Sequence, residues 1–152
     1  MNPHFYTNIN YPRQIKSLTK ETPLMSKEKR LSGKVEKGWG YELIWATNDL
    51  YCGKLMVFEK VGNKCSMHFH KEKDESWYVT EGKFLLRWID IETNEKRNQE
   101  LTKGMTWRNP PLQPHQLEAL EDNSSIMEVS TPDSIEDNFR ISPGDSQAKD
   151  MD

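Results

Sequence analysis

Glycine, proline, asparagine and aspartate residues divide the chain into short β-rich runs, spaced roughly every eight to twelve residues. No segment has the length and the 3.6-residue period of a long helix. Short strands at this spacing are typical of an antiparallel sandwich or barrel, so we expect an all-β fold. The predicted strands are Tyr41–Trp45, Gly53–Lys60, Lys64–His70, Glu75–Thr80, Lys83–Ile89, Lys96–Leu101, Met105–Arg108, His115–Leu120 and Ile126–Ser130.

A chain of 152 residues is long enough for one domain with a core and too short for two. The first 33 residues show no strand or helix period, and we expect them to form a partly flexible N-terminal arm. The barrel is predicted over residues 34–141, with a flexible C-terminal tail over residues 142–152. One helical turn is expected within Ser134–Asn138.

The charge of the chain is unevenly placed. The net charge is −3, but residues 1–38 contain eight Lys and Arg against three Glu, so this leader is +5 and the remainder is −8. The acidic body argues against nucleic acid as a partner, and the basic leader is interpreted as a solvated tail. No apolar run approaches the roughly 20 residues of a membrane span, and no signal peptide is recognised.

The chain has two cysteines, Cys52 and Cys65, which form no disulfide framework. Few cysteines without regular spacing indicate a reducing compartment, and we expect a cytoplasmic protein. A single Cys52–Cys65 disulfide is the alternative interpretation.

Three of the four histidines lie in segments that favour a shared metal ion. His68 and His70 are two residues apart, so both imidazoles project from the same face of a strand. Glu75 follows the polar run Lys71–Asp74, which we interpret as a hairpin loop that returns Glu75 beside the histidines. His115 follows a proline-rich loop and supplies the fourth candidate ligand.

Three neutral imidazoles and one carboxylate form a mixed nitrogen and oxygen set. Such a set suits Mn, Fe, Co, Ni or Zn, and contains too much nitrogen for Ca or Mg. A metal would also explain polar residues on the inward face of a barrel strand, where unpaired polar groups are costly. Because the ligands must be deprotonated, we expect metal loss as the pH falls through about 6.

Several aromatic and cationic residues near these segments have two interpretations. The tryptophans Trp77, Trp88 and Trp107 are suited to stacking on a sugar ring, although core packing is the preferred interpretation for at least two of them. The cations are candidate anion-binding residues or solvated charges: Lys64, Arg87, Arg108 and Arg140.

These motifs resemble those of the cupin superfamily. The first cupin motif is matched by Gly62, His68, His70, Glu75 and Gly82 at their usual spacing, and the second by Gly104, Pro110 and His115. The second match has Leu112 where a glycine is usual and Ala119 where an asparagine is usual. The resemblance implies a double-stranded β-helix of the jelly-roll type, often dimeric. It also implies that His68, His70, Glu75 and His115 bind one divalent metal.

Within this superfamily, the segments Trp39–Glu42, Glu128–Ser130 and Asp137–Arg140 resemble the cupin domain of type II phosphomannose isomerases. The resemblance implies functional roles for Arg140 and Lys64, and a sugar or sugar phosphate as the small-molecule substrate. Met67 stands where a glutamine is usual, and Ser142 and Pro143 replace an acidic pair.

Three functions follow from this pattern. The preferred one is a metal-dependent isomerase or epimerase of a sugar or sugar phosphate, acting as a homodimer. Arg140 or Lys64 would hold a phosphate or polarise an oxygen, and Glu118 or a metal-bound hydroxide are candidates for the base. The alternatives are an Fe(II)-dependent oxygenase and a non-catalytic sugar-binding module.

Overall fold

The computed structural model describes residues 31–148. Most of the predicted N-terminal arm and the last four residues of the predicted tail lie outside this range. Within it, the chain forms eleven strands and one helix: β1 Gly33–Lys37, β2 Gly40–Thr47, β3 Cys52–Phe58, β4 Met67–Phe69, β5 Glu75–Glu81, β6 Lys83–Ile89, β7 Lys96–Thr102, β8 Thr106–Asn109, β9 His115–Ala119, β10 Ser124–Ser130, β11 Phe139–Ser142 and α1 Asp145–Ala148.

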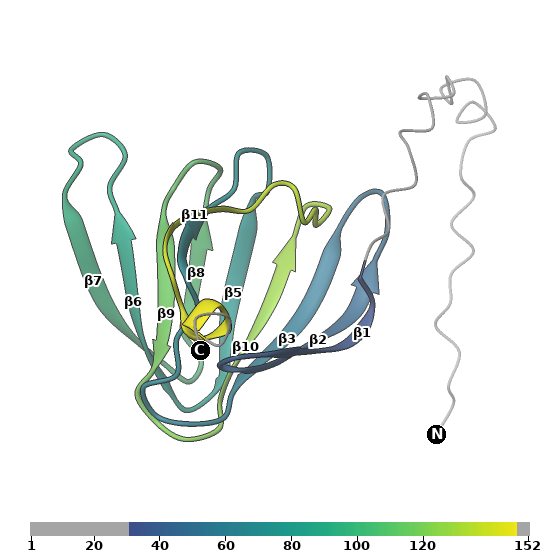
Figure 1. The fold of residues 1–152 in the computed structure, drawn as a ribbon, viewed down its shortest axis with the longest axis horizontal. Helices are drawn as coiled ribbons and strands as arrows, with labels where there is room; N and C mark the ends of the chain where they lie inside the picture. The colour runs from purple at the N-terminus through teal and green to yellow at the C-terminus, as the bar shows by residue number, and fades with distance from the viewer. Residues whose placement is uncertain (1–30, 149–152) are drawn as a thin grey trace, which may run out of the picture.

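The strands form two antiparallel sheets, which confirms the predicted all-β fold class. The six-stranded sheet has the order β1-β2-β3-β10-β5-β8, and the five-stranded sheet has the order β11-β4-β9-β6-β7. Figure 1 shows the strands curving around a shared interior, with β7 and β6 on one side and β2 and β1 on the opposite side. Sequence neighbours such as β5 and β6 therefore belong to different sheets.

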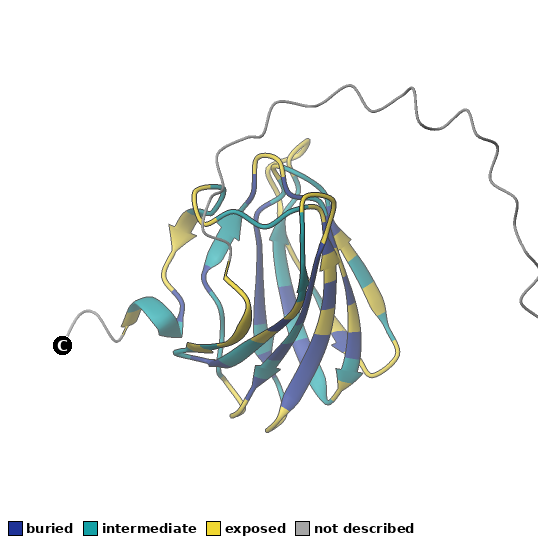
Figure 2. Cartoon of the chain, turned by 90° about the vertical axis from the view of Figure 1, so that its right-hand side faces the viewer, coloured by how far each residue is buried: buried dark blue, intermediate teal, exposed yellow. Residues whose placement is uncertain are grey.

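The apolar core fills one part of this interior. Phe58 is central to it, because its ring stacks on Trp39 at 4.3 Å between centroids and meets Phe84 edge-on at 5.2 Å. Leu86 and Ile126 are fully buried in the same cluster. Figure 2 shows the buried positions along the strands and the exposed positions concentrated in loops and edges. The alternation of buried and exposed residues along β5 and β10 is that expected of strands with one inward face.

The predicted tryptophan packing is also observed. Trp77 belongs to the buried core, and Trp88 and Trp107 pack against it with their rings 4.7 Å apart. Within the described residues, both cysteines are free, so the disulfide alternative is not realised. The only helix there is α1, and it lacks the length and apolar character needed to cross a membrane.

Two local predictions are wrong, and two strands were missed. The segment Lys71–Asp74 is not a hairpin loop, because β4 and β5 lie in different sheets and the loop crosses between them. The segment Ser134–Asn138 forms a turn without a helix. The edge strands β1 and β11 were not predicted, since few of their residues are apolar and buried. Because β11 includes Ser142 and α1 follows it, part of the predicted tail has regular structure.

Candidate metal centre

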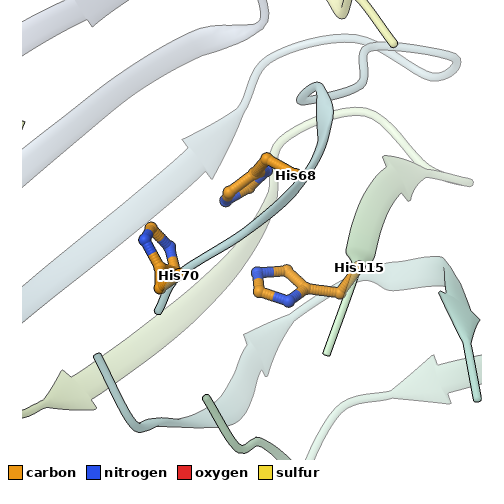
Figure 3. Close-up of side chains that lie close together, drawn as sticks. All are labelled: His68, His70 and His115. Atoms are coloured by element: carbon orange, nitrogen blue, oxygen red, sulfur yellow. The ribbon is translucent and has the colours of Figure 1, made fainter. Parts of the chain in front are cut away.

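Three histidines converge inside the barrel. His68 lies in β4 and pairs directly with His115 of β9, while His70 follows the end of β4. The ligand nitrogens of these three residues all lie within 4.8 Å of one another. Figure 3 shows the three imidazole rings facing a common space between the strands. The structure therefore contains a histidine group that fits a metal ion.

Hydrogen bonds fix the orientation of all three rings. The Nδ1 atom of His68 lies 2.9 Å from the carbonyl oxygen of Ser66, and that of His115 lies 2.9 Å from the carbonyl oxygen of Gln113. The Nδ1 atom of His70 contacts the carbonyl oxygen of Asp137. Because a carbonyl oxygen only accepts, each Nδ1 donates its proton. In its neutral form, each imidazole therefore presents its Nε2 lone pair to a ligand, as metal-binding histidines do.

Glu75 approaches this group from the opposite sheet. Its Oε1 lies 2.8 Å from the Nε2 of His115, and its Oε2 lies 3.9 Å from the Nε2 of His70. The Nε2 of His115 is buried and has no hydrogen-bond partner. A neutral imidazole lone pair facing a carboxylate oxygen is repulsive unless a proton or a metal ion lies between them. The residues present thus fit a divalent transition metal.

Burial keeps the histidines in the form that binds a metal. Loss of solvent on burial, followed by the proximity of His115, lowers the pKa of His68 to about 3. Burial and the charge of Lys73 lower the pKa of His70 as well. Both imidazoles are therefore neutral at pH 7. Acid release of a bound metal is expected at a lower pH than ordinary histidines would give.

A buried lysine that the sequence analysis did not single out lies beside Glu75. Lys73 is only 4% exposed, and its Nζ lies 2.8 Å from Oε2 of Glu75 and 2.7 Å from Oε1 of Glu128. Burial opposes ionisation of Glu75, but the charge of Lys73 outweighs it and holds the pKa of Glu75 well below its usual range. The carboxylate is therefore ionised.

The network of charges continues away from the histidines. Lys54 pairs with Asp133 at 2.7 Å and lies 3.9 Å from Glu42. Burial acts against ionised Asp133, but Lys73 and Lys54 prevail and lower its pKa to about 2. A usable signal existed in the sequence for Lys54, because it occupies an inward position of a strand whose other inward residues are apolar.

A cavity of about 280 Å³ joins the histidines to these charges. Its lining includes His68 and His70 and the apolar residues Met56, Phe58 and Leu117. Four cationic and four acidic side chains also line it: Lys37, Lys54, Lys73, Arg140, Glu42, Glu75, Glu128 and Asp133. Leu31 and Ile135 also line it and are exposed. The candidate metal centre therefore opens into a polar space large enough for a small molecule.

The three residues with predicted catalytic roles lie in different places. Arg140 lines the cavity and is the register partner of His68 across β11 and β4. Lys64 is not among the lining residues, although its backbone pairs with Glu118. Glu118 points away from the cavity, because it alternates with inward His115 and Leu117 along β9. Its carboxylate lies 2.8 Å from Arg87. Of these three residues, only Arg140 lines the cavity.

Asp137 organises the loop that contains Lys73. Its carboxylate accepts hydrogen bonds from the backbone N–H groups of Lys71, Glu72 and Lys73 at 2.7–3.1 Å. Its carbonyl oxygen also accepts the hydrogen bond from His70. One residue of the β10–β11 connection therefore holds both a candidate ligand and the buried lysine in place.

Comparisons with known proteins support the fold. No family model and no curated protein sequence matches the chain. Among solved structures, KdgF from Halomonas sp. is 24% identical with a TM-score of 0.54, over 63% of this chain and 81% of that one. Oxalate decarboxylase from Bacillus subtilis is 22% identical with a TM-score of 0.62, over 78% and 35%.

A further similar structure is CapF, a capsular polysaccharide assembling protein from Staphylococcus aureus. It is 17% identical with a TM-score of 0.62, over 72% of this chain and 34% of that one. The chain thus spans about one third of the length of CapF and of oxalate decarboxylase. Another structure of the decarboxylase concerns its Mn(II) centres. At these identities the likenesses establish a shared two-sheet fold, consistent with the cupin resemblance.

Proposed function

We propose that the chain is a metal-dependent isomerase or epimerase of a sugar or sugar phosphate, with His68, His70, Glu75 and His115 holding one divalent transition metal. The observation that supports this proposal most strongly is the convergence of three Nε2 lone pairs and a carboxylate on one side of a polar cavity. When bound, such a metal polarises carbonyl and hydroxyl oxygens as a Lewis acid.

The charge of the cavity favours an anionic substrate. Its four cationic and four acidic side chains cancel, so a divalent metal would leave an excess of two positive charges. Lys37, Lys54 and Lys73 are each paired with acidic groups. Arg140, in contrast, forms no ion pair within residues 31–148. Arg140 is therefore the residue we propose to bind a phosphate or carboxylate.

The base that moves the substrate proton is proposed from the lining residues. Isomerisation transfers a proton between adjacent carbons, which requires a group inside the cavity. Glu118 lies outside it, paired with Arg87. Glu128 lines the cavity, and burial together with nearby Glu75 raises its pKa despite the opposing charge of Lys73. Glu128 is thus a better candidate for the base than Glu118.

The remaining expectations about partners and location are also proposals. We propose a cytoplasmic homodimer that acts on a small molecule and binds neither nucleic acid nor a membrane. Exposed apolar side chains on the six-stranded sheet support self-association: Leu43, Trp45, Tyr78, Met127 and Val129. Cross-strand pairing places Leu43, Met127 and Tyr78 in one row on that sheet.

An assay with sugar phosphates tests the proposed function. Purified protein loaded with Mn²⁺ or Zn²⁺ is incubated in D₂O with mannose 6-phosphate and related aldose phosphates, and NMR follows ketose formation and deuterium incorporation. We expect turnover that His70→Ala abolishes and that Arg140→Ala weakens mainly through a higher KM. Glu118→Gln is the matched control, because its side chain points away from the cavity, and it should retain activity.

The same samples separate the alternative functions. Metal-dependent oxygen consumption without isomerised product would indicate the oxygenase, and a calorimetric binding signal without turnover would indicate a sugar-binding module. Absence of conversion across a broad panel by protein that has bound metal would reject the isomerase proposal.

A further inference from the structure

The two oxygens of the Glu75 carboxylate have different neighbours. Oε1 lies 2.8 Å from Nε2 of His115 and accepts a hydrogen bond from Nδ2 of Asn109 at 3.2 Å. Oε2 lies 2.8 Å from Nζ of Lys73 and farther, 3.9 Å, from Nε2 of His70. Glu75 is only 2% exposed, so both oxygens lie close to protein groups. These protein groups therefore influence which oxygen is available to a cation.

Asn109 holds its amide in one orientation. It is 1% exposed and pairs directly with Glu75 across β8 and β5. Its Oδ1 accepts a hydrogen bond from Nε1 of Trp107 at 2.8 Å. An indole nitrogen only donates, so the amide oxygen must face Trp107 and the amide nitrogen must face Glu75. Trp107 thereby directs the Asn109 donor toward Oε1.

Lys73 is also held in place, on the other side of the Glu75 carboxylate. Its ammonium group is buried and also contacts Glu128 at 2.7 Å and Asp133 at 3.4 Å. Three acidic partners and the backbone hydrogen bond from Lys73 to Asp137 keep its position. Moving this charge away from Oε2 would leave the buried carboxylates of Glu75 and Glu128 without their counter-charge.

We infer that Asn109 and Lys73 are positioning residues that divide the Glu75 carboxylate, with Asn109 presenting Oε1 to the histidine group and Lys73 withholding Oε2 from it. This inference rests on the proposed metal site. It leaves Glu75 with a single oxygen, Oε1, that is available to the metal ion. It also gives the two residues opposite effects on metal affinity, because Asn109 orients a ligand while Lys73 places a positive charge beside it.

The opposite signs separate positioning from ordinary structural roles. Both residues are buried, so removing either side chain should lower the free energy of unfolding of the metal-free protein. For metal affinity, Asn109→Ala should weaken Mn²⁺ binding by about tenfold or more, because the ligand oxygen loses its support. Lys73→Met should tighten Mn²⁺ binding by about tenfold, because a competing cation is removed from Glu75.

Two further variants complete the design. Trp107→Phe removes only the indole donor that orients Asn109, so it should weaken Mn²⁺ binding less than Asn109→Ala does. Lys103→Met is the matched control for Lys73→Met: Lys103 pairs with Glu81 at 2.7 Å, but both side chains are exposed and outside the cavity. This control should leave Mn²⁺ affinity unchanged.

In the experiment, metal-free full-length protein is titrated with Mn²⁺ alone, and binding is measured by calorimetry and by the EPR signal of free Mn²⁺. Urea unfolding in EDTA measures the stability of each variant. Weaker binding in Asn109→Ala together with tighter binding in Lys73→Met supports the inference. Changes of the same sign, or unchanged affinities, in variants that remain folded would overturn it while leaving the proposed metal site intact. Absence of Mn²⁺ binding by the unaltered protein would instead overturn the proposed function and, with it, this inference.

Discussion

At His68, burial couples the folding of the protein to pH. The pKa of this imidazole falls from 6.5 to about 3 on folding, chiefly through loss of solvent and then through His115. Between these two values the unfolded chain binds a proton that the folded chain does not, so acidification favours unfolding. The stability contributed by neutral His68 is complete above pH 6.5 and is lost as the pH falls toward 3.

We therefore predict that metal-free protein loses about 2 kcal/mol of stability between pH 7.5 and pH 5 through His68 alone. Urea unfolding in EDTA at both pH values measures the loss, and His68→Gln, which cannot titrate, should show a correspondingly smaller one. Titration of Asp133 does not affect this comparison of stability losses. Its pKa is lowered from 3.8 to about 2, so its contribution declines only below this pH window. An equal loss in both proteins would contradict the prediction.

At the scale of residues, the sequence predicted what local spacing determines. His68 and His70 could be assigned to one face of a strand because side chains alternate, and the structure places both in the histidine group. Lys73 and Asn109 could not be assigned in this way. Lys73 lies in a polar loop, and its burial depends on Glu128 of β10 and Asp133, which are about 60 positions away. Long-range contacts of this kind leave no local pattern.

At the scale of elements, the positions of the turns were easier to predict than whether the two strands beside a turn belong to the same sheet. Gly82 lies between two predicted strands, and both strands form within a residue of their predicted ends. However, β5 and β6 belong to different sheets, so Gly82 forms a corner between them. Local sequence gave no means of distinguishing a hairpin from a corner, because the choice depends on whether β10 and β9 pair with the two strands.

The corner at Gly82 provides a stability prediction. Gly82 has a positive φ of 70°, and a Cβ atom there would lie 2.3 Å from the Oγ of Ser124. Ser124 is fully buried, and its hydroxyl bonds both the N–H and the carbonyl oxygen of Lys83. Gly82→Ala should therefore combine backbone strain with a steric clash and destabilise the protein by about 3 kcal/mol.

Gly104 offers the matched control for this substitution. It also has a positive φ, 88°, but no atom lies within 4 Å of where its Cβ would be. Gly104→Ala should cost only the backbone strain, about 1 kcal/mol. Urea unfolding of both variants separates the two contributions. Equal destabilisation would show that contact with Ser124 adds nothing at Gly82.

At the scale of the whole molecule, the candidate ligands connect the two sheets. His68 and His115 belong to β4 and β9 of the five-stranded sheet, whereas Glu75 begins β5 of the six-stranded sheet. The two-sheet fold itself was predictable from strand spacing, because any such set of short strands must close over one core. The connection of the two sheets through the site was not predictable, because it depends on the Lys71–Asp74 loop crossing from one sheet to the other.

This arrangement predicts that a bound metal stabilises the entire barrel and not one loop. A ligand that binds only the folded state at a thousandfold excess over its Kd contributes about 4 kcal/mol, which corresponds to a rise in Tm on the order of 10 °C for a domain of this size. Calorimetric melting of the protein with Mn²⁺, and after removal of metal with EDTA, should show this difference as a shift of one cooperative transition.

In the double variant His70→Ala/His115→Ala, which keeps Glu75 and Lys73 but lacks two of the three imidazoles, the shift should disappear. A similar rise in this variant, or a second transition that responds to metal separately from the first, would mean that the cation does not join the two sheets.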